Sequence, residues 1–178
     1  MKILGLLRHA KSDWDDMSLR DFDRGLNHRG VRGAELMGRH IAAHGVRWDR
    51  ILASPANRVK STLAASGLQA PTSWEAAAYL ADSDTLMDLL RALDGDPDRV
   101  LLAGHNPGLQ ALILELVTPE QSQRLYDEVA AKYPTASFAV LELDIDQWAD
   151  CVPGCGRIAH FARPRDLDPE LGPERVSP

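Results

Sequence analysis

Apolar residues in this chain alternate between short unbroken runs and segments in which they recur every three or four positions. Unbroken runs at 3–7, 50–53 and 100–103 predict buried strands. The helical spacing is clearest between them, as in Leu86, Leu89, Leu90 and Leu93, which would share one helix face. This alternation of strands and helices favours an α/β fold with a largely parallel sheet.

The same pattern divides the rest of the chain. Helices are expected at about 27–44, 54–67, 83–93, 106–117 and 119–132, and further strands at 72–75, 137–143 and 157–162. The last two strands are expected to form a hairpin. Four prolines follow from position 163 onward, and they predict an extended tail after a single domain that covers 1–167, with 168–178 as the Pro-rich end.

Capping residues support several of these helices. Asn27 is placed as the N-cap of the first helix, and Ser54-Pro55 and Asn106-Pro107 both pair a capping residue with a proline suited to the first helical position. Gly45 and Gly67 are expected to end the first two helices.

Composition limits the number of domains, the compartment and the class of partner that can be expected. The chain has 178 residues, of which 44% are hydrophobic, enough for one domain with a full core. We find no membrane span or signal peptide, and only two cysteines, so a cytoplasmic protein is expected. The formal net charge of −6 argues against a nucleic-acid partner.

That charge is unevenly distributed. Residues 1–60 contain 12 Lys and Arg against 7 Asp and Glu, whereas the remaining residues contain 8 against 19. Such asymmetry is typical of an anion-binding region or an interaction tail, although composition alone favours a solvated surface.

Reactive residues follow three of the predicted strands. Arg8-His9 follows the first, Ser54 to Arg58 the second, and His105-Asn106 the strand at 100–103. Ligands bind beyond the carboxyl ends of strands in open parallel sheets, so we expect these residues to meet at one edge. Two arginines and two helix starts describe a phosphate site, and a neutral histidine within it is a competent nucleophile toward phosphorus.

Three motifs carry a resemblance to a known family. Leu7 to Ser12, Ser54 to Arg58 with Thr62, and Gly104 to Pro107 resemble the motifs of the histidine phosphatase (phosphoglycerate mutase-like) superfamily. The segments Asp21 to Arg24 and Arg163 to Leu167 are similar to the small SixA-type phosphohistidine phosphatases.

The resemblance implies a three-layer α/β/α sandwich and a phosphatase that needs neither a metal nor a cofactor. It implies that His9 accepts the phosphoryl group, that Arg8 and Arg58 bind its oxygens, and that His105 polarises it. Further residues predicted to bind phosphate or substrate are Ser12, Lys11, Asn106, Arg20 and Arg24.

The general acid is less well marked. Asp82 is the first candidate and Glu75 the second, with helix capping near Ser83 and Asp84 as the structural alternative. A site poor in acids suits phosphohistidine on a partner protein such as a histidine phosphotransfer domain, because imidazole leaves more readily than an alkoxide. The alternatives are a phosphate monoesterase or mutase acting on small molecules, and a silent phosphate-binding module.

The other histidines and the cysteines are not expected to take part in the chemistry. His28, His40 and His44 fall on or beside the helix at 27–44, where a solvated helix face is expected rather than a metal site, and His160 lies within a strand and is expected to be structural. Cys151 and Cys155 are expected to be free thiols in a loop.

Overall fold

A six-stranded sheet in the order β3-β2-β4-β1-β5-β6 forms the centre of the fold, and the computed structural model describes residues 1–173. The strands are β1 (Lys2–Arg8), β2 (Arg50–Ala53), β3 (Thr72–Trp74), β4 (Arg99–Gly104), β5 (Phe138–Leu143) and β6 (Gly156–Ala162). The first four run parallel to one another, while β5 is antiparallel to both β1 and β6. The predicted hairpin at the end of the chain is therefore confirmed, and the sheet is mixed with a parallel majority.

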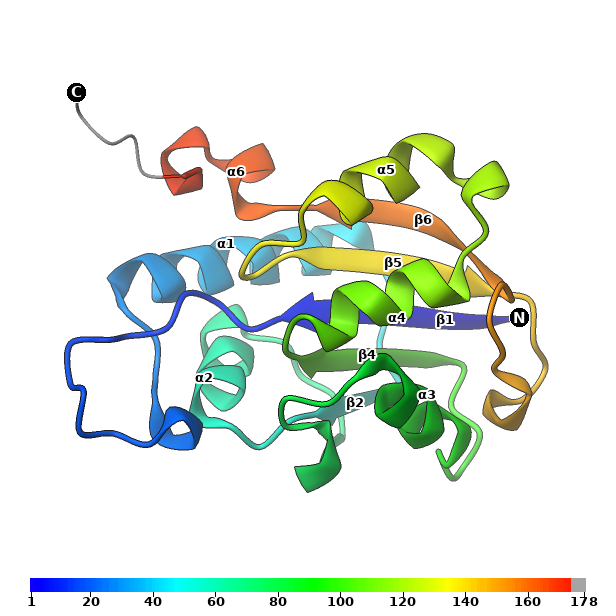
Figure 1. Cartoon of the computed structure of the whole chain (residues 1–178), viewed down its shortest axis with the longest axis horizontal. Coiled ribbons are helices and arrows are strands. Elements are labelled where there is room, and N and C mark those ends of the chain that lie inside the picture. The colour runs from blue at the N-terminus through cyan, green and yellow to red at the C-terminus, as the bar shows by residue number, and fades with distance from the viewer. Residues whose placement is uncertain (174–178) are drawn as a thin grey trace.

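Helices cover both faces of this sheet, as Figure 1 shows. They are α1 (His28–His44), α2 (Asn57–Ser66), α3 (Ser83–Arg91), α4 (Gly108–Leu116), α5 (Gln123–Ala131) and the short α6 (Pro164–Leu167). Apolar side chains of α1 and α2 pack on one face, and those of α3, α4 and α5 on the other. This arrangement is the three-layer α/β/α sandwich that the resemblance implied.

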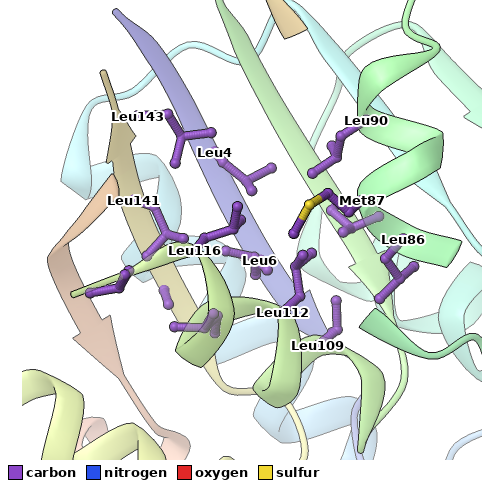
Figure 2. Close-up of a cluster of buried hydrophobic side chains, with 14 of the residues drawn as sticks. Leu4, Leu6, Leu86, Met87, Leu90, Leu109, Leu112, Leu116, Leu141 and Leu143 are labelled. Atoms are coloured by element: carbon purple, nitrogen blue, oxygen red, sulfur yellow. The ribbon is translucent and has the colours of Figure 1, made fainter. Parts of the chain in front are cut away.

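Strand β1 contributes to both layers because successive side chains of a strand point to opposite faces. Leu4 and Leu6 join the larger hydrophobic cluster with Leu90 of α3 and Leu112 of α4, as Figure 2 shows. Leu7 packs into the cluster on the other face. All five side chains are at most 1% exposed, so β1 is held firmly from both sides up to the residues that follow it.

Local signals explain where the first two helices begin and end. The Asn27 side chain accepts a hydrogen bond from the backbone N–H of Gly30 at 2.8 Å, which confirms it as the cap of α1. Gly45 and Gly67 end α1 and α2 with φ values of 93° and 71°, a conformation that favours glycine. Gly38 allows α1 to approach α2, because a Cβ there would lie 2.0 Å from the Ser66 carbonyl oxygen.

Two predicted helix starts were placed too early. Helix α2 begins at Asn57 rather than Ser54. The Ser54 hydroxyl accepts a backbone N–H just before the helix and also lies beside a histidine ring. Helix α4 begins at Gly108, after a cis peptide bond between Asn106 and Pro107. Asn106 still accepts a hydrogen bond from the N–H of Gln110 at 3.2 Å, so it satisfies one donor in the first turn.

The segments after α4 and β6 also differ from expectation. A short 3-10 turn at Pro119–Gln121 precedes α5, so the predicted helix at 119–132 is divided. The start of the tail was predicted to be extended and is instead helical at Pro164–Leu167 and in a 3-10 turn at Pro169–Leu171. Proline fits the first position of a helix, and here it starts each turn rather than preventing it. The end of the predicted tail, 174–178, lies outside the described residues.

Both outer strands of the sheet are protected. Strand β3 has only three residues, and the backbone N–H of Ile158 in β6 donates to the Ser122 hydroxyl at 2.9 Å. Among residues 1–173, no helix combines the length and apolar character that a membrane span requires.

Candidate functional site

The carboxyl ends of β1, β2 and β4 lie side by side, and each is followed by residues with reactive or phosphate-binding side chains. Arg8 is in register with Gly104, and Ala53 with Ala103. The backbone N–H of His9 donates to the Gly104 carbonyl at 3.0 Å, which ties the turn after β1 to the end of β4. The structure therefore brings the three predicted clusters to one edge of the sheet.

His9 is buried at this edge, with 8% of its surface exposed. Its Nδ1 lies 2.7 Å from the Ala10 carbonyl oxygen, an acceptor, so Nδ1 carries the proton and Nε2 keeps its lone pair. Burial lowers the pKa of His9 to about 4, and the positive charge of Arg8 acts in the same direction. At neutral pH the ring is uncharged and has the tautomer that a nucleophile at Nε2 requires.

Thr62 holds the turn that positions this histidine. Its hydroxyl accepts a hydrogen bond from the N–H of Ala10 at 2.8 Å and donates one to the Arg58 carbonyl at 2.7 Å. One buried side chain of α2 thus links the turn after β1 to the helix that carries Arg58.

His105 faces His9, with 5.3 Å between the two ring centroids. Its Nε2 is 2.7 Å from the hydroxyl of Ser54, so the residue expected to cap α2 orients this ring instead. Burial lowers the pKa of His105 to about 3, and the nearby positive charge of Arg58 lowers it further. Both histidines are therefore neutral at pH 7.

The two arginines enter the site from different elements. Arg58, on α2, is 5% exposed and donates to the backbone carbonyl of Asp21 at 2.8 Å. Arg8, at the end of β1, donates to the Tyr133 carbonyl at 3.0 Å. Its Nε is buried and has no hydrogen-bond partner within the described part of the chain, so this guanidinium retains donor capacity.

Asp21 and Tyr79 also belong to this cluster, and neither was among the predicted site residues. Asp21 Oδ2 accepts hydrogen bonds from Arg58, at 3.0 Å, and from the Tyr79 hydroxyl. The Tyr79 ring meets the His105 ring edge-on, with 5.5 Å between centroids. The Tyr79 hydrogen bond is the main cause that lowers the pKa of Asp21, and the Arg58 guanidinium adds to it. The Asp21 carboxylate is consequently ionised at neutral pH.

The two predicted general acids have different surroundings. Asp82 is exposed and is itself the N-cap of α3, because its carboxylate accepts from the N–H of Thr85 at 2.9 Å. The cap was expected one or two residues later, near Ser83 or Asp84. Glu75 directly follows β3 and is half-buried, and its backbone N–H donates to the Ala53 carbonyl at 2.8 Å. The carboxylate that is hydrogen-bonded to Arg58 belongs to neither candidate but to Asp21.

The remaining residues predicted to bind phosphate or substrate differ in their contacts and in their exposure. Asn106 donates to the same Tyr133 carbonyl as Arg8, at 3.0 Å. Arg24 is buried and its guanidinium lies 3.8 Å from the centre of the Trp14 ring. Arg20 is exposed and pairs with Asp23 at 2.6 Å, so the structure turns it toward a carboxylate of its own loop.

Lys11 and Ser12 follow the nucleophile in sequence. Lys11 is exposed, and Ser12 forms an isolated bridge with Leu26 that closes the loop between β1 and α1. Both residues therefore lie beside the turn that carries His9.

The histidines on α1 meet a third one on β6. His40 Nε2 lies 2.8 Å from His160 Nε2, and the His44 ring stacks on His160 with 4.5 Å between centroids. Burial lowers the pKa of His160 to about 4. Within residues 1–173 no group of three or more His, Cys, Asp or Glu side chains is arranged to hold a metal ion.

The two cysteines are free thiols, as predicted. Cys151 is buried in the larger hydrophobic cluster, and Cys155 packs against that cluster. A hydrogen bond from the Cys151 thiol lowers the pKa of Cys155 to about 6.

The carboxyl edge of β1, β2 and β4 thus brings together the buried neutral imidazole of His9, a second neutral imidazole that faces it, and two arginines. Guanidinium groups match phosphate oxygens, and imidazole both attacks phosphorus and leaves it. The arrangement is therefore suited to phosphoryl transfer through a histidine.

Sequence similarity to known proteins extends over most of this chain. The family model of the histidine phosphatase superfamily (branch 1) matches residues 4–86. An uncharacterized protein of Mycobacterium tuberculosis is 34% identical over 160 residues, which cover 89% of this chain and 100% of that protein.

Two similar solved structures come from bacterial proteins identified as candidate SixA phosphohistidine phosphatases. The one from Nakamurella multipartitia has a TM-score of 0.80 at 30% identity, covering 92% of this chain and 96% of its own. The one from Agrobacterium tumefaciens has a TM-score of 0.73 at 30% identity, covering 90% of this chain and 97% of its own. These similarities continue well beyond residue 86, where the family match ends.

Proposed function

Because this chain belongs to the histidine phosphatase superfamily, we propose that it hydrolyses phosphohistidine on a partner protein through a phosphorylated His9. Phosphatase activity is supported by the family and by the similarity to the candidate SixA proteins. The observation that carries the proposal is the facing pair of neutral rings, His9 and His105, beside Arg58.

The proposed reaction has two steps. Arg8 and Arg58 bind the phosphoryl oxygens, and His9 Nε2 attacks phosphorus while the bond from phosphorus to the substrate nitrogen breaks. The departing imidazole keeps that electron pair and leaves neutral, since its other nitrogen is already protonated by solvent. Water then attacks phospho-His9, which releases inorganic phosphate and restores the neutral ring. Throughout, His105 and the arginines stabilise the charge on the transferring group.

Asp21 supports the choice of phosphohistidine over an ester. Its ionised carboxylate cannot protonate a departing alkoxide, which an ester needs. A carboxylate beside the site instead favours a substrate whose leaving group carries positive charge, as protonated phosphohistidine does. The side chain of Asp21 is 45% exposed, so an arriving substrate can reach its carboxylate.

The test uses a histidine phosphotransfer domain that carries phosphohistidine. We expect the wild-type protein to release phosphate from it, and His9→Ala to abolish the release. The control is His44→Ala, because His44 lies at the opposite end of α1 from the loop that carries the site. A phosphorylated intermediate that is stable in alkali and labile in acid is expected in the wild type and in His44→Ala, but not in His9→Ala.

The outcomes separate this proposal from its alternatives. Turnover of a chromogenic phosphate ester without turnover of the phosphoprotein would indicate a small-molecule phosphatase. Binding of phosphate without any turnover would indicate a silent phosphate-binding module. If wild type and His9→Ala release phosphate at equal rates, the proposed nucleophile is wrong.

A further inference from the structure

The two cysteines of this chain lie on one short loop, at the end of the sheet opposite to the candidate site. The loop, Cys151 to Cys155, follows the 3-10 turn at Trp148–Asp150 and leads into β6, and Figure 1 shows the start of β6 near the N-terminus. Strand β6 pairs through β5 with the first residue of β1, whereas His9 follows the last residue of β1. A chemical change at the cysteines therefore leaves the carboxyl edge of β1, β2 and β4 in place.

The backbone of this loop brings the two thiols together. The N–H of Cys155 donates to the Val152 carbonyl at 3.2 Å, and Gly154 has a φ of 76°, a conformation that favours glycine. The loop thus turns back on itself, and the Cys151 thiol is hydrogen-bonded to that of Cys155. The sequence contains only these two cysteines, so each is the one possible intramolecular disulfide partner of the other.

Two helices hold the loop in this conformation. Arg91 of α3 donates from its Nε to the Cys151 carbonyl at 2.8 Å. The backbone N–H of Gly154 donates to the carbonyl of Glu115 in α4 at 2.9 Å. Because the loop is bonded to two different helices, the sulfur atoms are kept next to each other, as disulfide formation requires.

The surroundings of the two thiols are different. Cys151 is fully buried in the larger hydrophobic cluster, whereas Cys155 is half-buried and follows three exposed residues, 152–154. The hydrogen bond from Cys151 lowers the pKa of Cys155, while burial acts in the opposite direction. Since the thiolate is the reactive form of cysteine, an oxidant that arrives from solvent meets Cys155 first, with the Cys151 thiol directly behind it.

We propose that Cys151 and Cys155 form a redox-modification site, at which a peroxide converts the two thiols into an intramolecular disulfide. A small oxidant is favoured over a bulky one because Cys155 is only partly exposed. The proposal does not depend on the proposed phosphatase activity, because it concerns the opposite end of the sheet.

The reaction has two steps. The Cys155 thiolate attacks one oxygen of hydrogen peroxide, the O–O bond breaks, and the departing hydroxide takes up a proton to become water, which leaves Cys155 as a sulfenic acid. The Cys151 sulfur then attacks the Cys155 sulfur, the S–O bond breaks, and the hydroxyl group leaves as water with the thiol proton of Cys151. In total, the two thiols lose two electrons and two protons, and one peroxide is reduced to two waters.

The disulfide has two consequences for the protein. It prevents further oxidation of Cys155 to a sulfinic acid, which ordinary thiols do not reverse. It also closes the loop through which the start of β6 is bonded to α3 and α4, and so restricts the unfolded chain. The oxidised protein is expected to melt about 5 °C higher than the reduced protein.

The first experiment identifies the product of oxidation. The full chain is treated with a small molar excess of hydrogen peroxide, unfolded, alkylated with iodoacetamide and digested with trypsin, which releases both cysteines in one peptide, 133–157. We expect this peptide to have lost two hydrogen atoms and to carry no alkyl group, and dithiothreitol to restore both alkylation sites. Two alkylated cysteines after peroxide treatment, or a disulfide that joins two chains, would overturn the proposal.

Single variants assign the roles of the two thiols. Dimedone, which labels sulfenic acids, should label Cys155 in Cys151→Ala, because the thiol that would displace the hydroxyl group is absent. Labelling of Cys151 in Cys155→Ala should be about tenfold slower at the same peroxide concentration, since Cys151 is fully buried. Equal labelling rates in the two variants would contradict the order of the two steps.

The melting temperature tests the structural consequence. Peroxide should raise it by about 5 °C in the wild type, and dithiothreitol should reverse the rise. The matched control is Cys155→Ala, which keeps the four methionines that peroxide also oxidises and should show no rise. An equal rise in this control, or no rise in wild type that carries the disulfide, would contradict the stabilising role of the pair.

Discussion

The carboxylate of Asp21 accepts a hydrogen bond from the guanidinium of Arg58 at 3.0 Å, so the arginine expected to bind phosphate is already partnered by an anion. A phosphoryl group at His9 has to share Arg58 with this carboxylate. The pair therefore affects both how Arg58 is positioned and which charge on the substrate is tolerated.

Replacing Asp21 by Asn keeps the side-chain shape and removes the charge. We expect kcat/KM for phosphohistidine to fall about tenfold, the equivalent of roughly 1.4 kcal/mol, because the protonated, cationic phosphohistidine loses its counter-charge. Turnover of a chromogenic ester should change much less. The control is Asp23→Asn, since Asp23 pairs with the exposed Arg20. An equal loss on both substrates would mean that Asp21 only positions Arg58.

Replacing Tyr79 by Phe removes the hydroxyl that donates to Asp21 while keeping the ring that meets His105 edge-on. Because this hydrogen bond is the main cause of the lowered pKa of Asp21, the pKa should rise toward its usual value of about 3.9. The acidic limb of the pH profile of kcat/KM is expected to move to higher pH. A profile that keeps its position while only its height changes would argue against this coupling.

Replacing Ser54 by Ala removes the hydroxyl that lies 2.7 Å from His105 Nε2. Since Ser54 is fully buried, the free energy of unfolding should fall by about 1–3 kcal/mol, and turnover should fall as His105 loses its orientation. Denaturant unfolding and steady-state kinetics measure the two effects. Ser61→Ala is the matched control, because that hydroxyl bonds only the nearby Asn57 side chain in α2. Unchanged turnover would show that packing alone holds His105 in place.

The two buried histidines predict how stability depends on pH. Their pKa values, about 4 for His9 and about 3 for His105, lie below the value of about 6.5 expected in the unfolded chain. The unfolded state therefore binds more protons, and the contribution of each histidine to stability is complete above about pH 6.5 and is lost as the pH falls, toward about 4 for His9 and about 3 for His105. Each histidine contributes a slope of up to about 1.4 kcal/mol per pH unit in that range. The unfolding free energy of His9→Asn should show a shallower slope than that of wild type, and an identical slope would contradict the assignment.

Much of the fold follows from local patterns in the sequence. The buried strands β1, β2 and β4 are continuous apolar runs, and the carboxyl ends of parallel strands meet at one edge. Those two facts were enough to bring His9, Arg58 and His105 together. Helix starts were less predictable at Ser54 and Asn106, because both side chains take part in contacts with distant residues as well as with their own helices.

The residues that sequence reasoning missed depend on loop geometry. Asp21 is 37 positions from Arg58 and 58 from Tyr79, and no periodicity links three such positions. Two signals were available: Asp21 opens the segment 21–24 that is similar to SixA-type proteins, and Tyr79 follows β3 at the same edge of the sheet as the other clusters. The sequence also did not show that Asp82 caps α3, so its role as general acid stays a prediction beside that structural role.

The two outer strands of the sheet limit how this protein can associate with other chains. β3 presents only three residues, and Ile158 on β6 already donates its backbone N–H to Ser122. A free strand edge invites pairing with another chain and, from there, aggregation. One edge is therefore short and the other is occupied at Ile158, which leaves a further strand fewer backbone groups to pair with. Both features act against uncontrolled growth of the sheet by edge-to-edge pairing.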